Sequence, residues 1–154
     1  MENLSLYDLL VGGFMLRGDD PLQGGHALED MPEDEKLRLS IAENLTMLLQ
    51  TRRGSVMHLP DFGIPDILQV YQDAGCSLDP VRTLVRETIL KYEPRISEVK
   101  VQKEFFDPNS MRISLRILAT IKEANQREIL LTEFSTTGWA KVLFERDTKH
   151  EPRA

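Results

Sequence analysis

Few residues in this chain of 154 have the types and the spacing that chemistry requires. The histidines, His26, His58 and His150, lie far apart, and Cys76 has no histidine near it in the sequence. A zinc site needs such groups together, so we expect no metal site, and we interpret Cys76 as a small packed residue. Neither glycine pair fits the spacing of a phosphate-binding or dinucleotide-binding loop. The sequence therefore predicts no cofactor, no small-molecule substrate and no catalytic residue.

Carboxylates are the residues for which a catalytic role has to be considered. Two of them set roughly 5–10 Å apart are enough to hydrolyse a glycosidic bond. Glu93 is the best candidate acid, because it lies between two elements among apolar neighbours, and Asp61 or Asp66 would be its partner. The guanidinium of Arg95 would keep Glu93 ionised, which is the wrong state for a general acid. A small peptidoglycan hydrolase is therefore the alternative interpretation, and a protein that is not an enzyme is the leading one.

The tripeptide Glu93-Pro94-Arg95 has a structural meaning of its own. Pro94 ends a preceding helix and favours an extended Glu93, so the chain turns abruptly into a strand. Charges at such a junction must be paired if they are buried. Two arrangements stay open: both side chains bind within the domain, for example to Arg52, Arg53 or a loop carbonyl, or Arg95 reaches a partner protein.

The first part of the chain is predicted to be an arm. Residues 3–11 form a short amphipathic segment with Leu6, Leu9 and Leu10 on one face, and the rest of residues 1–33 is rich in glycine, proline and acids. The apolar face needs cover, either from its own domain or from another subunit. We expect these three leucines to bind a partner.

Three helices are expected to follow. The strongest, from about Asp34 to Gln50, has acids in its first turn and is followed by arginines and Gly54, which could cap it. A short helix is expected over about 65–74. The third has Asp79 as its N-cap residue, Pro80 in its first turn, and must stop before Pro94.

After the third helix the apolar period changes from 3.6 to 2. The sequence predicts strands over 96–106, 111–121 and 127–135, and residues 139–144 as a fourth strand or a packed tail. In the first strand, Val99, Val101, Lys103 and Phe105 are expected on one side. The predicted fold class is α+β, with N-terminal helices packed on a C-terminal antiparallel three- to four-stranded β-meander. The domain would span 34–146, and 147–154 would be a frayed polar tail.

Composition excludes several classes of function. The net charge of −6 comes from residues 1–36, where nine acids and two bases give −7, while the remainder has 16 acids and 17 bases. Without a basic patch we expect no nucleic-acid partner. No apolar run approaches the roughly 18 residues of a membrane span, so we expect no direct contact with a membrane. The single cysteine and the absence of a signal-like start indicate a cytoplasmic protein.

Three segments in a fixed order resemble the phage baseplate-wedge and TssE family. Residues 41–54 are similar to the family's "I..NL..LLNTR.G" segment, including Asn44, Arg52 and Gly54. Residues 60–66, with Phe62 and Gly63, resemble its "P.YG.PD" stretch, although Phe62 replaces the usual tyrosine. Residues 89–101 are similar to its signature "I..YEPRL..V.V", and residues 4–10 resemble the "SLFERL" opening of the secretion-system (TssE) branch.

The resemblance implies a structural subunit of a type VI secretion baseplate wedge, assembled in the cytoplasm at the inner membrane. It implies baseplate partners TssF and TssG, with TssK nearby. It further implies that the sheet pairs with strands of the sheath subunits TssB and TssC and so primes sheath assembly. Glu93, Pro94 and Arg95 would then form a docking corner. Asn44, Arg52, Gly54, Phe62 and Gly63 would be structural parts of the motifs.

Overall fold

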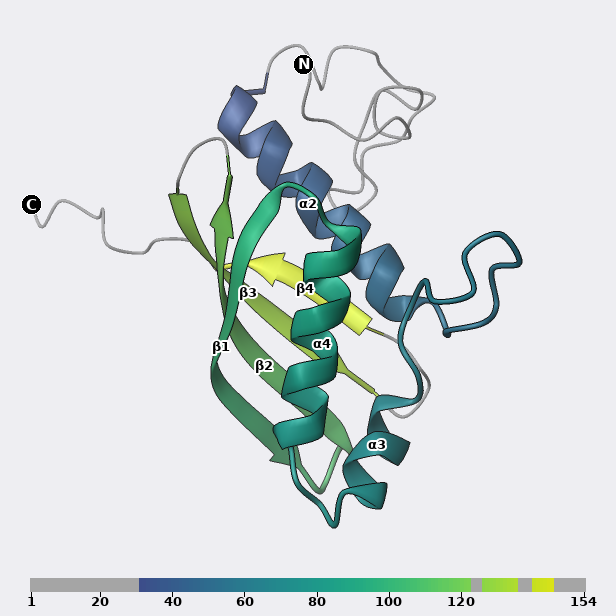
Figure 1. Cartoon of the computed structure of the whole chain (residues 1–154). Coiled ribbons are helices and arrows are strands. Elements are labelled where there is room, and N and C mark those ends of the chain that lie inside the picture. The colour runs from purple at the N-terminus through teal and green to yellow at the C-terminus, as the bar shows by residue number, and fades with distance from the viewer. Residues whose placement is uncertain (1–30, 123–125, 136–139, 146–154) are drawn as a thin grey trace, which may run out of the picture.

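The structure is a computed structural model, and it describes residues 31–122, 126–135 and 140–145. In this part of the chain helices come first and strands follow: α2 (Glu33–Gln50), α3 (Ile67–Asp73), α4 (Asp79–Tyr92), β1 (Ile96–Asp107), β2 (Arg112–Ile121), β3 (Gln126–Phe134) and β4 (Ala140–Phe144). The strands form one antiparallel 4-stranded sheet in the order β1-β2-β3-β4 (Figure 1). The predicted α+β class with a meander is therefore confirmed, and the segment 139–144 does contribute a strand. The predictions for residues 1–30 and for the tail 147–154 lie outside the described residues.

Helix α2 starts where acids meet the positive end of the helix dipole. Glu33, Asp34 and Glu35 occupy its first turn, and Lys36 pairs with Glu33 at 3.1 Å. The hydrogen bond and the charge of Lys36 lower the pKa of Glu33 below its ordinary value. These contacts favour a helix start at Glu33, although Pro32, in the N-cap position, makes no side-chain cap hydrogen bond.

The end of α2 differs from the prediction that Gly54 caps it. The helix stops at Gln50, and Thr51 is extended, with φ −77° and ψ 126°. Gly54 lies further on, in a turn that the Ser55 amide closes by donating to the Arg52 carbonyl at 3.1 Å. Its φ of +88° suits that turn, because glycine adopts positive φ without steric cost. Arg52 therefore lies beyond the end of the helix, in the turn that contains Gly54.

The two shorter helices begin at polar residues. Asp66 caps α3 by accepting hydrogen bonds from the amides of Leu68 (3.1 Å) and Gln69 (3.3 Å). The prediction that Asp79 is the N-cap of α4 is wrong by one residue, because the Leu78 carbonyl already accepts the first helical hydrogen bond, from the Arg82 amide. Asp79 is thus the first helical residue, in the turn where an acid is favourable.

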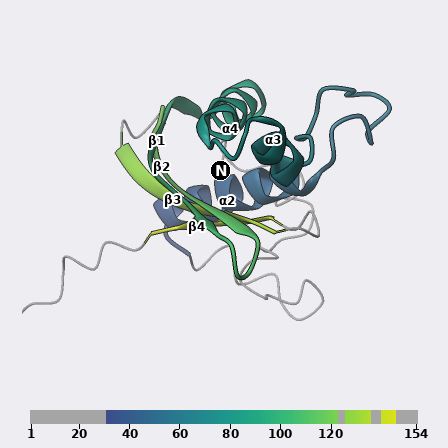
Figure 2. The ribbon, with the colours of Figure 1, turned by 90° about the horizontal axis from the view of Figure 1, so that it is seen from below.

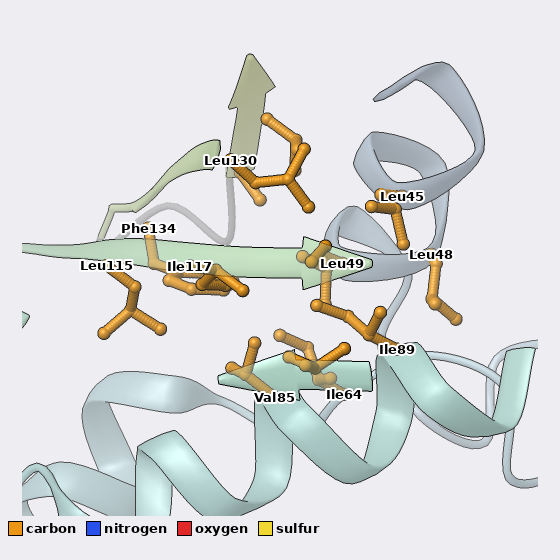
Figure 3. Packing of buried hydrophobic residues seen from close by; sticks show 14 of the residues in the cluster. Leu45, Leu48, Leu49, Ile64, Val85, Ile89, Leu115, Ile117, Leu130 and Phe134 are labelled. Atoms are coloured by element: carbon orange, nitrogen blue, oxygen red, sulfur yellow. The ribbon is translucent and has the colours of Figure 1, made fainter. Parts of the chain in front are cut away.

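Among the described residues, the helices lie on one face of the sheet, and no described helix covers its other face (Figure 2). Along β2 the burial alternates residue by residue, so one side of the strand faces the helices. Helix α2 lies against β4 and α4 lies against β1. The core between these layers is built from aliphatic side chains of both (Figure 3): Leu45, Leu48 and Leu49 of α2, Val85 and Ile89 of α4, and Leu115, Ile117 and Leu130 of the sheet.

Strand β1 changes face partway along, which the sequence did not reveal. Its register against β2 shifts between Val101 and Lys103, and such a bulge reverses the side on which every later side chain lies. Val99 is buried as predicted, but Phe105 lies on the open face with 62% of its surface exposed. Phe106 takes the inner position and stacks on Tyr71 of α3 with ring centroids 4.6 Å apart. The prediction of one common face for Val99 and Phe105 is therefore wrong.

The β1–β2 turn is held by the side chain of Asp107. Its carboxylate accepts hydrogen bonds from the Ser110 hydroxyl (2.7 Å) and the Asn109 amide (2.9 Å). These two hydrogen bonds, the Ser110 one foremost, hold the pKa of Asp107 below its ordinary value. Met111 completes the turn with φ 53°.

Candidate functional site

The junction between α4 and β1 is an abrupt corner built around Pro94. The Glu93 amide donates the last helical hydrogen bond, to the Ile89 carbonyl at 2.9 Å, and Glu93 then turns extended with φ −118° and ψ 89°. The Ile96 amide donates to the Glu93 carbonyl at 3.2 Å, which closes a turn over Pro94. Pro94 itself is exposed at the tip of the corner.

Glu93 and Arg95, on either side of Pro94, form a bidentate ion pair. Arg95 Nε lies 2.7 Å from Glu93 Oε1, and Arg95 Nη2 lies 2.8 Å from Glu93 Oε2. The Arg95 amide also donates to Glu93 Oε1, at 3.2 Å. Glu93 is 0% exposed, whereas 17% of the Arg95 side chain is exposed. The planar guanidinium thus neutralises a fully buried carboxylate, while the Arg95 side chain as a whole stays partly exposed.

Helix α2 completes this network. Asn44 Nδ2 donates to Glu93 Oε2 at 2.8 Å, and Arg95 Nη1 donates to the Ser40 hydroxyl oxygen at 2.8 Å. Ser40 and Asn44 are four residues apart, so they lie on the same face of the helix. The network therefore ties α2 to the corner.

The two arrangements left open by the sequence can now be compared with the contacts. Glu93 and Arg95 bind within the domain, but the predicted partners Arg52 and Arg53 are not the ones used: both lie exposed beyond the end of α2. The sequence analysis also missed Ser40. Its spacing of four from Asn44 was the available signal.

The loop after α2 returns to the end of that helix and pairs with it. The Arg53 amide donates to the Ile64 carbonyl and the Ile64 amide to the Thr51 carbonyl, both at 3.0 Å, as a short parallel bridge. Gly63 has φ +97°, and a Cβ atom placed on it would lie 2.2 Å from the Thr51 carbonyl oxygen. Only glycine fits there, because both the backbone angle and the space exclude a side chain.

An aromatic contact joins this loop to α4. The rings of Phe62 and Tyr92 meet edge to face, with centroids 5.2 Å apart and planes at 78°. Tyr92 directly precedes Glu93. The three segments singled out in the sequence therefore meet in space: Asn44 of the first contacts Glu93 of the third, and the second, with Phe62 and Gly63, packs on both.

The two other candidate carboxylates, Asp61 and Asp66, each interact with a group of the domain. Asp61 lies 3.4 Å from Lys91 on the surface, and Asp66 caps α3. A small hollow of about 210 Å³ beside them is lined by Arg53, Asp61, Leu84, Glu87, Thr88, Lys91 and Tyr92, and so carries both signs of charge. Glu93 is fully buried and both of its carboxylate oxygens are hydrogen-bonded within the domain, so this arrangement does not present Glu93 together with Asp61 or Asp66 to a substrate as an acid–base pair.

Two further expectations concern the surface and the N-terminal arm. Cys76 is exposed, at a left-handed φ of 63°, so the prediction of a packed cysteine is wrong. Within the described ranges no cluster of His, Cys, Asp and Glu could hold a metal, and none of the helices there is long and apolar enough to span a membrane. Leu6, Leu9 and Leu10 lie outside the described residues.

Fold and site together define a small α+β domain with one open sheet face and a corner whose buried charges are neutralised from within. The family model described as "Baseplate wedge protein gp25" matches residues 35–126, more than half of the chain. The chain belongs to this baseplate wedge family.

A solved structure agrees with this assignment. The chain resembles a protein in a structure described as "The baseplate complex from the type VI secretion system", with 25% sequence identity and a TM-score of 0.53 over 74% of this chain and 98% of that one. It also resembles a putative tail lysozyme from Geobacter sulfurreducens, at 18% identity and a TM-score of 0.45 over 77% and 96% of the two chains. That second likeness is too weak to bear on activity. No curated protein matches the chain.

Proposed function

We propose that this chain is a structural, non-enzymatic subunit of a type VI secretion baseplate wedge, assembled in the cytoplasm at the inner membrane. The observation that carries the proposal is the likeness to a chain of that baseplate complex, which extends over 98% of that chain's length. Its partners would be TssF and TssG, with TssK nearby, and the sheath subunits TssB and TssC.

The corner is the proposed contact with the baseplate partners. Pro94 is exposed in this corner, and the side chain of Arg95 next to it is partly exposed. Glu93 supports this contact indirectly, since its carboxylate fixes the orientation of Arg95 from below. The leucines Leu6, Leu9 and Leu10 would provide a second, apolar contact from the N-terminal arm.

A free strand edge is the proposed contact with the sheath. On each edge strand, a backbone carbonyl already accepts a hydrogen bond from a helix side chain. Gln50 Nε2 donates to the Ala140 carbonyl of β4 at 2.6 Å, and Arg86 Nε donates to the Val99 carbonyl of β1 at 3.1 Å. Strand β4 has 5 residues and β1 has 12. Strand β1 therefore has more backbone available for pairing beyond Val99, whose carbonyl is already hydrogen-bonded. Along an antiparallel strand the backbone groups alternate in direction, which turns those of Glu104 and Phe106 outward. We propose that a strand from the sheath adds to this second half of β1.

The corner is best tested at Pro94, since changes at Glu93 or Arg95 would also destabilise the fold. Removing one partner of a buried ion pair costs about 3–5 kcal/mol, and a misfolded variant would imitate a lost interface. Pro94→Glu adds a charge at an exposed tip and breaks no hydrogen bond. We expect it to unfold within a few degrees of the parent and to lose at least about tenfold in affinity for TssF and TssG, measured by co-purification and titration.

Pro94→Ala is the matched control, because it removes the same ring without adding a charge. It should retain most of the binding. If Pro94→Glu binds as well as the parent chain, the corner is not the contact. If the parent chain itself brings down no baseplate subunit, the baseplate role is wrong.

A further inference from the structure

The connection between α2 and α3 projects from the domain (Figure 1). It also carries exposed apolar side chains. Met57 is 93% exposed and Leu59 is 49% exposed. A single exposed leucine needs no explanation. Here, however, two large apolar side chains lie two residues apart in one projecting loop. Together they expose apolar surface of the kind that often marks an interaction site.

This loop is held in shape by its own backbone. Three successive turns follow one another, closed by hydrogen bonds from Ser55 to Arg52, from Leu59 to Val56 and from Phe62 to Leu59, at 3.1, 3.2 and 3.0 Å. At its base the bridge between Arg52 and Ile64 and the close approach of Gly63 fix it to the end of α2. A loop ordered before binding loses little conformational entropy when a partner binds it.

Two arginines flank the base of the loop. Arg52 and Arg53 are exposed there, while the one acid of residues 55–61, Asp61, pairs with Lys91 of α4. A complementary surface would therefore be apolar at its centre and acidic at its rim. Methionine suits such a contact, because its flexible side chain adapts to an irregular pocket.

We propose that the loop 55–61 is a plug, which inserts Met57 and Leu59 into an apolar pocket with an acidic rim on a neighbouring protein subunit of the assembly. This inference rests on the proposed function, and it adds a contact separate from the Pro94 corner. A protein pocket is favoured over a membrane surface. Residues 55–61 include no tryptophan, tyrosine or phenylalanine, the side chains that commonly anchor a protein at a membrane interface.

The test uses the full chain with both apolar residues changed, Met57→Asp and Leu59→Asp. Both side chains are largely exposed, so the variant should keep the parent's unfolding midpoint. We expect its affinity for the purified baseplate subunits to fall at least about tenfold, because two acids cannot enter an apolar pocket with an acidic rim. Leu143→Asp, on the open face of the sheet and 41% exposed in the parent, is the matched control and should bind normally.

A photo-crosslinker placed at position 57 identifies the surface that receives the loop. Crosslinks to an apolar, acid-rimmed site of a baseplate subunit support the proposal. Equal binding of the double variant and the parent overturns it while leaving the baseplate role intact, whereas absent binding of the parent overturns both. Sedimentation with phosphatidylserine–phosphatidylcholine vesicles is the third arm: binding that the double variant loses would assign the loop to a membrane and refute the protein pocket.

Discussion

Glu93 and Gly63 show how single residues determine this corner. A carboxylate with no exposed surface is tolerated only because Arg95 and Asn44 satisfy both of its oxygens. Gly63 is required for a different reason: a Cβ atom at this position would lie 2.2 Å from the Thr51 carbonyl oxygen. The first is an electrostatic requirement and the second is a steric one, and both join segments far apart in the sequence.

Gly63→Ala should be the most damaging small substitution in the loop. The added methyl group meets a backbone oxygen at 2.2 Å and also has to adopt φ +97°. Positive φ alone costs an alanine about 1 kcal/mol, and the clash forces the bridge to Ile64 apart, so we expect a loss of about 3 kcal/mol or more. Urea unfolding measures it.

Gly54→Ala is the control, since its φ is +88° but nothing lies within 4 Å of the new methyl group. It should cost only about 1 kcal/mol. Equal losses for the two variants would mean that backbone strain, and not close approach, makes Gly63 necessary.

Strand β1 combines two functions that its bulge separates. Before the bulge, Val99 faces the core and its carbonyl is blocked by Arg86. After it, Phe105 faces the open side, and Glu104 faces the helices, where it pairs with Arg82 at 3.2 Å. The first half of the strand therefore belongs to the core, and the second half carries the proposed edge for a sheath strand.

Glu104→Pro tests this edge. Proline lacks the outward amide that an added strand would use, yet an edge strand tolerates it because its own sheet does not need that amide. We expect a folded chain that still joins the baseplate but supports few sheaths, counted by fluorescence microscopy of a labelled sheath subunit in cells. Glu104→Ala loses the same Arg82 pair and keeps the amide, so sheaths should form. Normal sheath numbers with Glu104→Pro would show that pairing occurs elsewhere.

The described part of the chain contains a buried core to which all of its helices and strands contribute. Its buried cluster extends from Ile41 of α2 to Val142 of β4 and draws on every helix and strand between. Residues 1–30 carry the acidic charge and the three leucines proposed to bind a partner. The acidic arm and the core would then have separate tasks, assembly for one and stability for the other.

Replacing Leu6, Leu9 and Leu10 together by alanine tests this division. The cooperative unfolding transition should shift by no more than a few degrees, because a change of about 1 kcal/mol corresponds to roughly 2–8 °C in domains of this size range. Binding to the baseplate partners should weaken about tenfold or more. A large loss of thermal stability would instead show that the arm packs on its own domain.

Local pattern was enough to predict most elements. The apolar period of 3.6 located α2 and α4, the period of 2 located the strands, and proline placed the end of α4 before Pro94. The predicted end of α2 at Gln50 was also confirmed. The predictions that failed concern the face of Phe105, which the bulge in β1 turns outward, the capping of α2 by Gly54, and the packing of Cys76, which is exposed.

The sequence by itself determined the α+β class, the order of the elements and the three motifs, because helix and strand periods and turn residues act over a few neighbouring positions. Only the tertiary structure decided what the buried charges bind. Which atoms meet Glu93 depends on how α2 packs against the α4–β1 corner, and that packing brings Ser40 and Asn44 to Glu93 and Arg95 across about fifty residues of chain. Contacts of that range depend on the whole core and leave no local pattern.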